Sequence, residues 1–274
     1  IGEVNANIAR AREFCFKLTP HSIDLLCFPE MAFTGYVFDS AEAILPYLEE
    51  PRTGPSSLFC QEVAKHLGCY VAGGYPERLS EEERRAESQA VHTPVGANSA
   101  ILYGPSGEWV GGYRKTNLFE TDKTWAKAGT GFVSFSLTLP HVTSTESENA
   151  PAPNSLEMSI AICMDLNPAP SHEQTPSVEW PYELADYCVR NKSRLLVLLD
   201  AWLDSDSDDG EDEEDAGDGA SDNEPNWHTL RYWAARLQPL WGRDWRRPGS
   251  NETLLPPHET IVVVCNRTGT ENGV

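Results

Sequence analysis

The sequence lacks the features by which membrane and nucleic-acid-binding proteins are recognised. No apolar run approaches the length that crosses a bilayer, and the opening Ile-Gly-Glu-Val-Asn does not resemble a signal peptide. Basic residues are not clustered: Arg84-Arg85 and Arg243 to Arg247 are short or interrupted, whereas duplex binding needs a continuous basic surface. We therefore expect a soluble cytoplasmic protein without membrane or nucleic-acid partners; a nuclear location is compatible with the same features.

Motifs for metals, disulfides and serine catalysis are also missing. The seven cysteines form no Cys-x-x-Cys pair, and the seven histidines form no His-x-x-x-His pair. No Gly-x-Ser-x-Gly nucleophile elbow is present, which argues against a serine hydrolase. We expect reduced thiols, no metal and no cofactor.

Acidic residues are concentrated in one tract. The formal net charge is −21, and twelve of the acidic residues lie between Asp204 and Glu224, where Lys, Arg, aromatic and large aliphatic residues are absent. The rest of the chain carries only −9, from −21 + 12. Such a tract cannot bury enough apolar surface to offset its ordering entropy. We expect residues 204–224 to be a disordered insertion within one domain.

Apolar periodicity predicts helices alternating with short strands. The expected helices are 4–18, Ser56–Leu67 and Trp227–Leu240; the expected strands are Ile23–Phe28, Cys69–Gly73, Ser99–Tyr103, Trp109–Tyr113, Phe132–Leu139, Met158–Ile162, Leu195–Leu199 and Ile261–Cys265, with a loop at 141–157. The alternation indicates an α/β protein. Because two strands form a hairpin, the sheets must be mixed.

Three reactive residues follow the ends of expected strands: Glu30, Lys115 and Cys163. Strand ends and their loops commonly form the active crevice of α/β proteins, so these side chains are candidates to converge. Taken singly each is weak, because a loop Glu or Lys is usually a solvated charge and a Cys after Ile-Ala-Ile is more often a core residue.

The contexts of these residues carry a family resemblance. Phe-Pro-Glu30-Met-Ala-Phe-Thr-Gly-Tyr, Gly-Tyr-Arg-Lys115-Thr-Asn-Leu-Phe-Glu-Thr-Asp and Ile-Ala-Ile-Cys163-Met-Asp-Leu-Asn-Pro resemble, in order, the Glu, Lys and Cys motifs of the nitrilase, or carbon–nitrogen hydrolase, superfamily. The closing Val-Cys-Asn266-Arg-Thr-Gly is similar to another family segment. The resemblance implies a single-domain, four-layer α-β-β-α sandwich over residues 1–274. Family members have a further strand before the opening helix and a further segment at the end, so the chain is expected to be trimmed at both ends.

The resemblance also implies roles for these residues in amide hydrolysis. Cys163 would be the nucleophile, Glu30 the general base, and Lys115 the oxyanion stabiliser. The N–H of Met164 could be a second oxyanion donor. We further expect the cationic Lys115 to lower the pKa of the Cys163 thiol.

Four nearby residues are secondary candidates. Glu120 could be the additional carboxylate that family members place near the Lys; the alternative is a solvated loop residue. Asp165 could contact a substrate ammonium, although capping of the helix after the nucleophile is favoured by the preference of Asp for that position. Asp122 and Trp125 could shape a pocket for a peptide α-ammonium.

The residues of these motifs are most similar to one branch of the superfamily, the eukaryotic N-terminal asparagine and glutamine amidases. These enzymes deamidate an N-terminal Asn or Gln to Asp or Glu in the N-degron pathway, which implies protein or peptide N-termini as substrates. The ω-amidase and biotinidase-like branches share the three catalytic residue types and stay open. A further alternative is an inactive nitrilase-fold binding module that captures a basic partner through the acidic tract.

Overall fold

The structure is a computed structural model that describes residues 1–87, 93–139, 155–168, 181–202, 225–241, 259–269 and 271. The acidic tract at 204–224, expected to be disordered, lies outside the described residues. Most of the expected loop at 141–157 also lies outside them. Its last three residues, 155–157, belong to a strand, which corrects that expectation. No helix in the described part of the chain has the length and apolarity needed to span a membrane.

The first sheet contains four strands in sequence order: β1 (Leu25–Phe28), β2 (Tyr70–Arg78), β3 (Gly96–Tyr103) and β4 (Trp109–Arg114). β1 pairs with β2 in parallel, whereas the β2–β3 and β3–β4 pairs are antiparallel. β2 is longer than the predicted Cys69–Gly73 because its second half pairs with β3 beyond the end of β1.

The second sheet also contains four strands: β5 (Val133–Thr138), β6 (Ser155–Ile162), β7 (Leu195–Asp200) and β8 (Ile261–Asn266). β5 and β6 are antiparallel, while β6, β7 and β8 run in parallel. Both sheets are therefore mixed, as predicted. β7 is buried at all six positions, which explains its nearly continuous apolar sequence.

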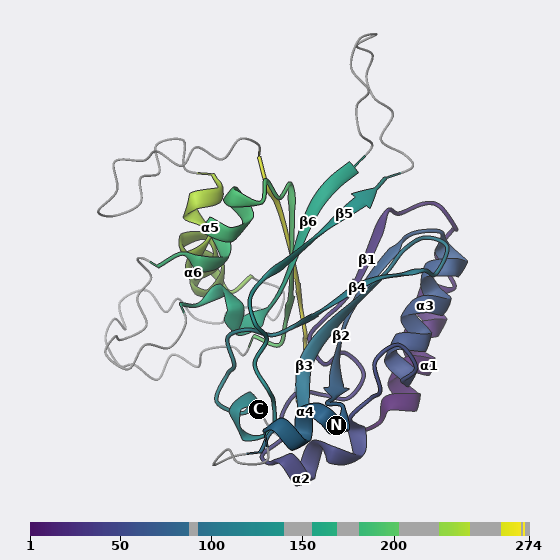
Figure 1. The fold of residues 1–274 in the computed structure, drawn as a ribbon. Helices are drawn as coiled ribbons and strands as arrows, with labels where there is room; N and C mark the ends of the chain where they lie inside the picture. Colours follow the sequence, from purple (N-terminus) through teal and green to yellow (C-terminus); the bar gives the residue numbers. More distant parts are fainter. Residues whose placement is uncertain are drawn as a thin grey trace, which may run out of the picture.

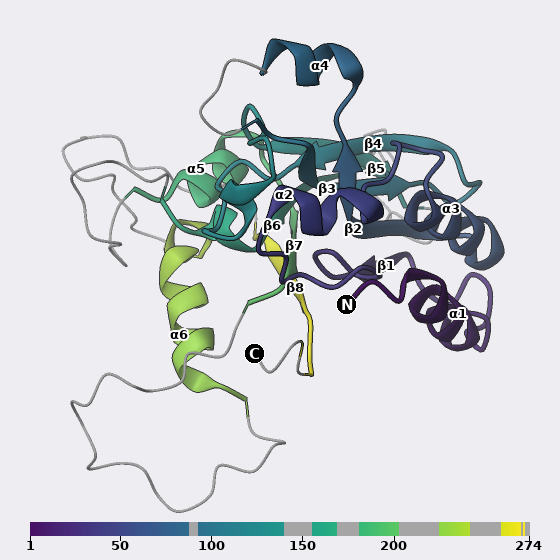
Figure 2. The ribbon, with the colours of Figure 1, turned by 90° about the horizontal axis from the view of Figure 1, so that it is seen from below.

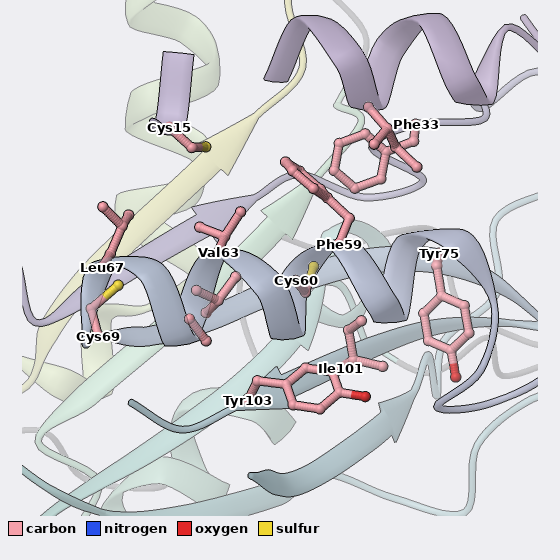
Figure 3. Close-up of a cluster of buried hydrophobic side chains, with 13 residues drawn as sticks. Cys15, Phe33, Phe59, Cys60, Val63, Leu67, Cys69, Tyr75, Ile101 and Tyr103 are labelled. Atoms are coloured by element: carbon pink, nitrogen blue, oxygen red, sulfur yellow. The ribbon is translucent and has the colours of Figure 1, made fainter. Parts of the chain in front are cut away.

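Two helices cover the outer face of the first sheet, α1 (Val4–Cys15) and α3 (Pro55–Leu67). Their apolar side chains pack in one cluster with side chains of β2 and β3. Phe59 of α3 and Ile101 of β3 are two of its members (Figure 3). α3 ends at Gly68, whose φ of 65° lies in the left-handed region that favours glycine. The helix predicted at 4–18 exists but ends at Cys15.

Helices on the opposite side cover the second sheet: α5 (Glu183–Arg190), α6 (Trp227–Arg236) and the short 3₁₀ helix η4 (Gln238–Leu240). The prediction of one helix over Trp227–Leu240 is corrected to these two elements. Pro239 lacks a backbone N–H and cannot continue an α-helix. α5 was not predicted, although one face of it is buried.

The inner faces of the two sheets pack against each other. Tyr70, Ala72 and Leu102 from the first sheet share a core cluster with Ile160 and Val197 from the second. The layers therefore follow the order helix, sheet, sheet, helix, which both views of the ribbon show (Figures 1 and 2). This is the predicted four-layer α-β-β-α sandwich. Three shorter helices lie in connections: α2 (Ala41–Ile44), α4 (Glu81–Ala86) and the 3₁₀ helix η1 (Leu45–Tyr47).

Candidate active site

Glu30, Lys115 and Cys163 lie together, although they come from three different strands and two sheets. Lys115 Nζ is 2.7 Å from Glu30 Oε1. The N–H of Ala201, directly after β7, donates to Glu30 Oε2 at 2.8 Å, and the same backbone group lowers the pKa of the neighbouring Cys163 thiol. The Ala201 amide thus connects the candidate base with the candidate nucleophile. The convergence expected from the strand ends is present in the structure.

A tight turn after β1 places Glu30 in the interior. Met31 has a φ of 48°, a conformation that non-glycine residues rarely adopt. The turn packs directly on Gly74 of β2, where a Cβ atom would meet Pro29 O at 2.6 Å and Glu30 Cα at 2.7 Å. Arg267, after β8, donates from Nη1 to Met31 O at 2.7 Å and to Glu30 O at 3.3 Å. Three separate elements therefore fix the position of Glu30.

The Glu30 carboxylate is fully buried, and burial raises its pKa. Lys115 and Asn98 oppose this increase: the Lys115 ammonium by charge and hydrogen bonding, and Asn98 Nδ2 by donating to Oε1 at 2.6 Å. A carboxyl group with a raised pKa and a fixed cationic neighbour is suited to accept and return a proton near neutral pH.

Asp122, rather than Glu120, is the second carboxylate beside Lys115. Asp122 Oδ2 lies 2.7 Å from Lys115 Nζ, and Asp122 Oδ1 accepts a hydrogen bond from Asn98 at 3.2 Å. The Glu120 side chain is 78% exposed and pairs with Lys123 on the surface. The expected additional catalytic role for Glu120 is therefore corrected. The short 3₁₀ helix η2 (Asp122–Thr124) turns Asp122 inward, whereas Glu120 precedes it on the outside.

Tyr36 is a neighbour of this ion pair that sequence reasoning missed. Its hydroxyl lies 3.5 Å from Asp122 Oδ2, and the Lys115 ammonium is 5.5 Å from its ring centroid. The cation–π contact adds to the charges that keep Lys115 protonated. The Lys115 pKa is raised: burial lowers it most, but the carboxylates of Glu30 and Asp122 outweigh burial. The signal available in the sequence was an aromatic residue in the loop that follows Glu30.

Cys163 begins the 3₁₀ helix η3 (Cys163–Leu166) at the end of β6 and has a φ of 42°. Cys163 is 8% exposed, and its backbone N–H donates to Asp200 Oδ1 at 2.9 Å. Burial, followed by the charge of Glu30, raises the pKa of the thiol well above its ordinary value, and Lys115 opposes this only in part. Lys115 lowers the thiol pKa, as expected, but burial and the charge of Glu30 outweigh its effect. The resting site favours a protonated thiol next to a base.

Asp165 links the segment after β4 to the end of β6 through hydrogen bonds at both of its carboxylate oxygens. Its Oδ1 accepts from the N–H groups of Thr116 and Asn117 at 3.0 and 2.8 Å. Its Oδ2 accepts from the Tyr113 hydroxyl at 2.7 Å and the Ile162 N–H at 2.8 Å. The expected contact with a substrate ammonium is corrected, because both oxygens are already occupied. The alternative role at the helix start fits, although Asp165 acts from inside η3 rather than from the N-cap.

Trp125 and Met164 lie beside the three central residues. Trp125 is 1% exposed and belongs to the buried cluster that contains Met31, Tyr36 and Ala201, so it packs next to the segment that carries Glu30. Met164 directly follows Cys163 in η3, and its carbonyl accepts from Asn167 N at 3.0 Å.

Asp200, the last residue of β7, is a further buried acid that the sequence analysis did not consider. It is 1% exposed, and burial together with the charge of Glu30 raises its pKa to about 7. Its Oδ1 accepts from Cys163, whereas its Oδ2 has no hydrogen-bond partner among the described residues. The sequence signal for Asp200 was an acidic residue at the end of an otherwise apolar strand. Within the described ranges, no group of three or more His, Cys, Asp or Glu residues is arranged to hold a metal.

Comparisons with known proteins identify the family to which the chain belongs. The family model described as Carbon-nitrogen hydrolase matches residues 2–167. The protein N-terminal amidase of Schizosaccharomyces pombe is 34% identical over 292 residues, which cover 99% of this chain and 83% of that protein. Solved structures of N-terminal amidase with a Gln-Val peptide and with an Asn-Glu peptide each superpose with a TM-score of 0.59 at 29% identity. Each match covers 75% of this chain but only 46% of the solved chain. The chain belongs to the carbon–nitrogen hydrolase family.

Proposed function

We propose that this protein removes the side-chain amide of an N-terminal Asn or Gln from proteins or peptides, giving Asp or Glu and ammonia. The observation that carries the proposal is the convergence of Glu30, Lys115 and Cys163 around the Ala201 amide. Similarity to N-terminal amidases over nearly the whole chain supports the choice of substrate.

The first half-reaction would form a thioester. Glu30 takes the proton of the Cys163 thiol as the sulfur attacks the side-chain carbonyl carbon of the substrate. Deprotonation and attack would coincide, because burial disfavours a free thiolate in the resting site. Lys115 stabilises the oxyanion, and the Met164 N–H would add a second donor. The carbon–nitrogen bond then breaks, and Glu30 returns the proton to the departing ammonia.

The second half-reaction would release the acid. Glu30, again ionised, takes a proton from water as that water attacks the thioester carbonyl. The carbon–sulfur bond breaks, and the proton returns from Glu30 to the Cys163 sulfur. Asp122 would keep Lys115 charged throughout, because its carboxylate balances the ammonium when Glu30 is protonated.

Ammonia release from matched peptides tests the proposal. Peptides beginning with Asn or Gln are expected to be deamidated, whereas peptides with the same residue at the second position are not. Cys163→Ala is expected to abolish release. Turnover of a free small amide without turnover of either peptide would instead assign the protein to the ω-amidase or biotinidase-like branch.

Deletion of residues 204–224 separates the enzyme from the alternative of an inactive binding module. An amidase is expected to keep its ammonia release without the tract. A binding module would show no release in either form and would lose a basic partner when the tract is removed.

A further inference from the structure

This inference rests on the proposed function and concerns how the free amine of the substrate is recognised. In an N-terminal Asn, three bonds separate the α-nitrogen from the side-chain carbonyl carbon, so the two atoms are at most about 4 Å apart. In Gln, one more bond extends the separation to about 5 Å. The ammonium must therefore enter the same buried site as the reacting carbon. It needs an anionic partner there, because an unpaired buried charge is strongly unfavourable.

Most of the buried carboxylates near Cys163 already have partners at both oxygens. Glu30 accepts from Lys115 and Asn98 at Oε1 and from Ala201 at Oε2. Asp122 accepts from Lys115 at Oδ2 and from Asn98 at Oδ1. Asp165 accepts from four donors in the surrounding loops. A substrate ammonium would have to displace a bond that holds the site together in each of these cases.

Asp200 is different from these three acids. One of its oxygens accepts from the backbone N–H of Cys163 at 2.9 Å, which keeps the carboxylate next to the nucleophile. The other oxygen, Oδ2, is buried and has no hydrogen-bond partner among the described residues. Buried polar atoms without a partner are rare in proteins and call for a ligand or a functional explanation. Asp200 is no less accessible than Glu30 and Lys115, which are each 0% exposed and yet must meet the substrate.

We propose that Asp200 Oδ2 binds the α-ammonium of the N-terminal Asn or Gln and thereby restricts the enzyme to substrates with a free amine. The charge balance of the site agrees with this assignment. Glu30, Asp122, Asp165 and Asp200 supply four carboxyl groups, against the Lys115 ammonium and the Arg267 guanidinium near Glu30. Negative charge is in excess there, so a further cation is favoured. Internal Asn and Gln residues, as well as N-terminally acetylated ones, lack that cation.

The test compares two substrates that differ only in the amine. One is a peptide that begins with Asn. In the other, a succinamoyl group replaces that Asn, which keeps the side-chain amide but has hydrogen in place of the α-ammonium. At pH 7 most of the α-amine is charged, because its ordinary pKa is about 7.7 to 8.0. We expect wild type to favour the amine-bearing peptide in kcat/KM by about 100-fold, as for a charged hydrogen bond in a buried site.

Asp200→Asn is the informative variant, because it retains an oxygen for the Cys163 N–H but removes the negative charge. We expect the preference to shrink to less than about 10-fold, mainly through a higher KM for the amine-bearing peptide. Glu49→Gln, another buried acid that binds Ser56 outside the site, is expected to leave the preference unchanged.

An equal loss of both activities in Asp200→Asn, with the preference intact, would overturn the assignment and leave Asp200 a purely structural neighbour of Cys163. A wild type that shows no preference for the amine would overturn it as well. Failure of the proposed function is recognised separately, because wild type would then release ammonia from neither Asn nor Gln peptides.

Discussion

Asp122 Oδ2 lies 2.7 Å from Lys115 Nζ, so the ammonium next to Glu30 is shared between two buried carboxylates. Burial raises the Glu30 pKa most and the Lys115 ammonium opposes it, while the negative charge of Asp122 adds to the increase. The Asp122 carboxylate also keeps Lys115 charged when Glu30 accepts a proton. We therefore expect Asp122 to act on the reaction through Lys115 and Glu30 rather than by binding the substrate.

Asp122→Asn is expected to lower kcat by about 10- to 100-fold while KM for an N-terminal Asn peptide changes little. Loss of its charge lowers the Glu30 pKa, so the acidic limb of the pH–rate profile should move to lower pH. Steady-state kinetics across pH measure both effects. Glu120→Gln is the matched control, because Glu120 is two residues away but exposed, and it should behave as wild type. A large rise in KM in Asp122→Asn would restore a substrate-binding role for Asp122.

Alkylation should identify Cys163 among the seven cysteines and report on its surroundings. Iodoacetamide resembles the amide substrate and is expected to place one label on Cys163, with loss of ammonia release. Iodoacetate should react far more slowly, since its negative charge meets the excess of buried acids. Peptide mass mapping locates the label, and glutathione gives the intrinsic rate ratio of the two reagents. Labelling elsewhere with full loss of activity would contradict the assignment of the nucleophile.

Removal of Asp165 should destabilise the protein more than removal of a surface acid. Asp165→Ala leaves three backbone N–H groups and the Tyr113 hydroxyl without their acceptor in a buried region. We expect the free energy of unfolding to fall by about 3 kcal/mol or more, measured by urea denaturation. Asp39→Asn, at an exposed position, should change it by less than about 0.5 kcal/mol. Similar stabilities for the two variants would show that the Asp165 contacts contribute little.

The raised pKa of Asp200 predicts a pH dependence of stability. With a folded pKa of about 7 against an ordinary 3.8, the folded protein binds a proton more tightly than the unfolded chain. This contribution is fully present below pH 3.8 and is lost as the pH rises through about 7. Wild type should therefore lose stability relative to Asp200→Asn across this window, by on the order of a few kcal/mol. Thermal unfolding of both proteins at a series of pH values measures the difference. Parallel profiles would show that Asp200 ionises normally in the folded state.

Much of the fold was predictable because local patterns coincide with tertiary burial. The apolar run Leu195–Leu199 is buried on both faces of its sheet, and its composition alone identified it as a strand. Helix α5 was missed because it is only 8 residues long and its apolar positions are interspersed with Tyr187 and Asp186. The length of β2 was underestimated because Gly73, Gly74 and Pro76 read as a strand end. Pro76 is tolerated since β1 pairs only as far as Gly73.

The sequence alone determined which residues are chemically suited to the reaction and that each stands at a strand end, since these are properties of residue type and local order. Only the tertiary structure decided between Glu120 and Asp122, removed Asp165 from the substrate candidates and revealed Asp200 beside Cys163. It also showed that burial and the charge of Glu30 outweigh the lowering of the Cys163 pKa by Lys115. The physical reason is that burial and the nearest charges set the pKa and the available partners of a carboxylate or thiol. Those depend on contacts between strands far apart in the chain, and local sequence patterns do not encode them.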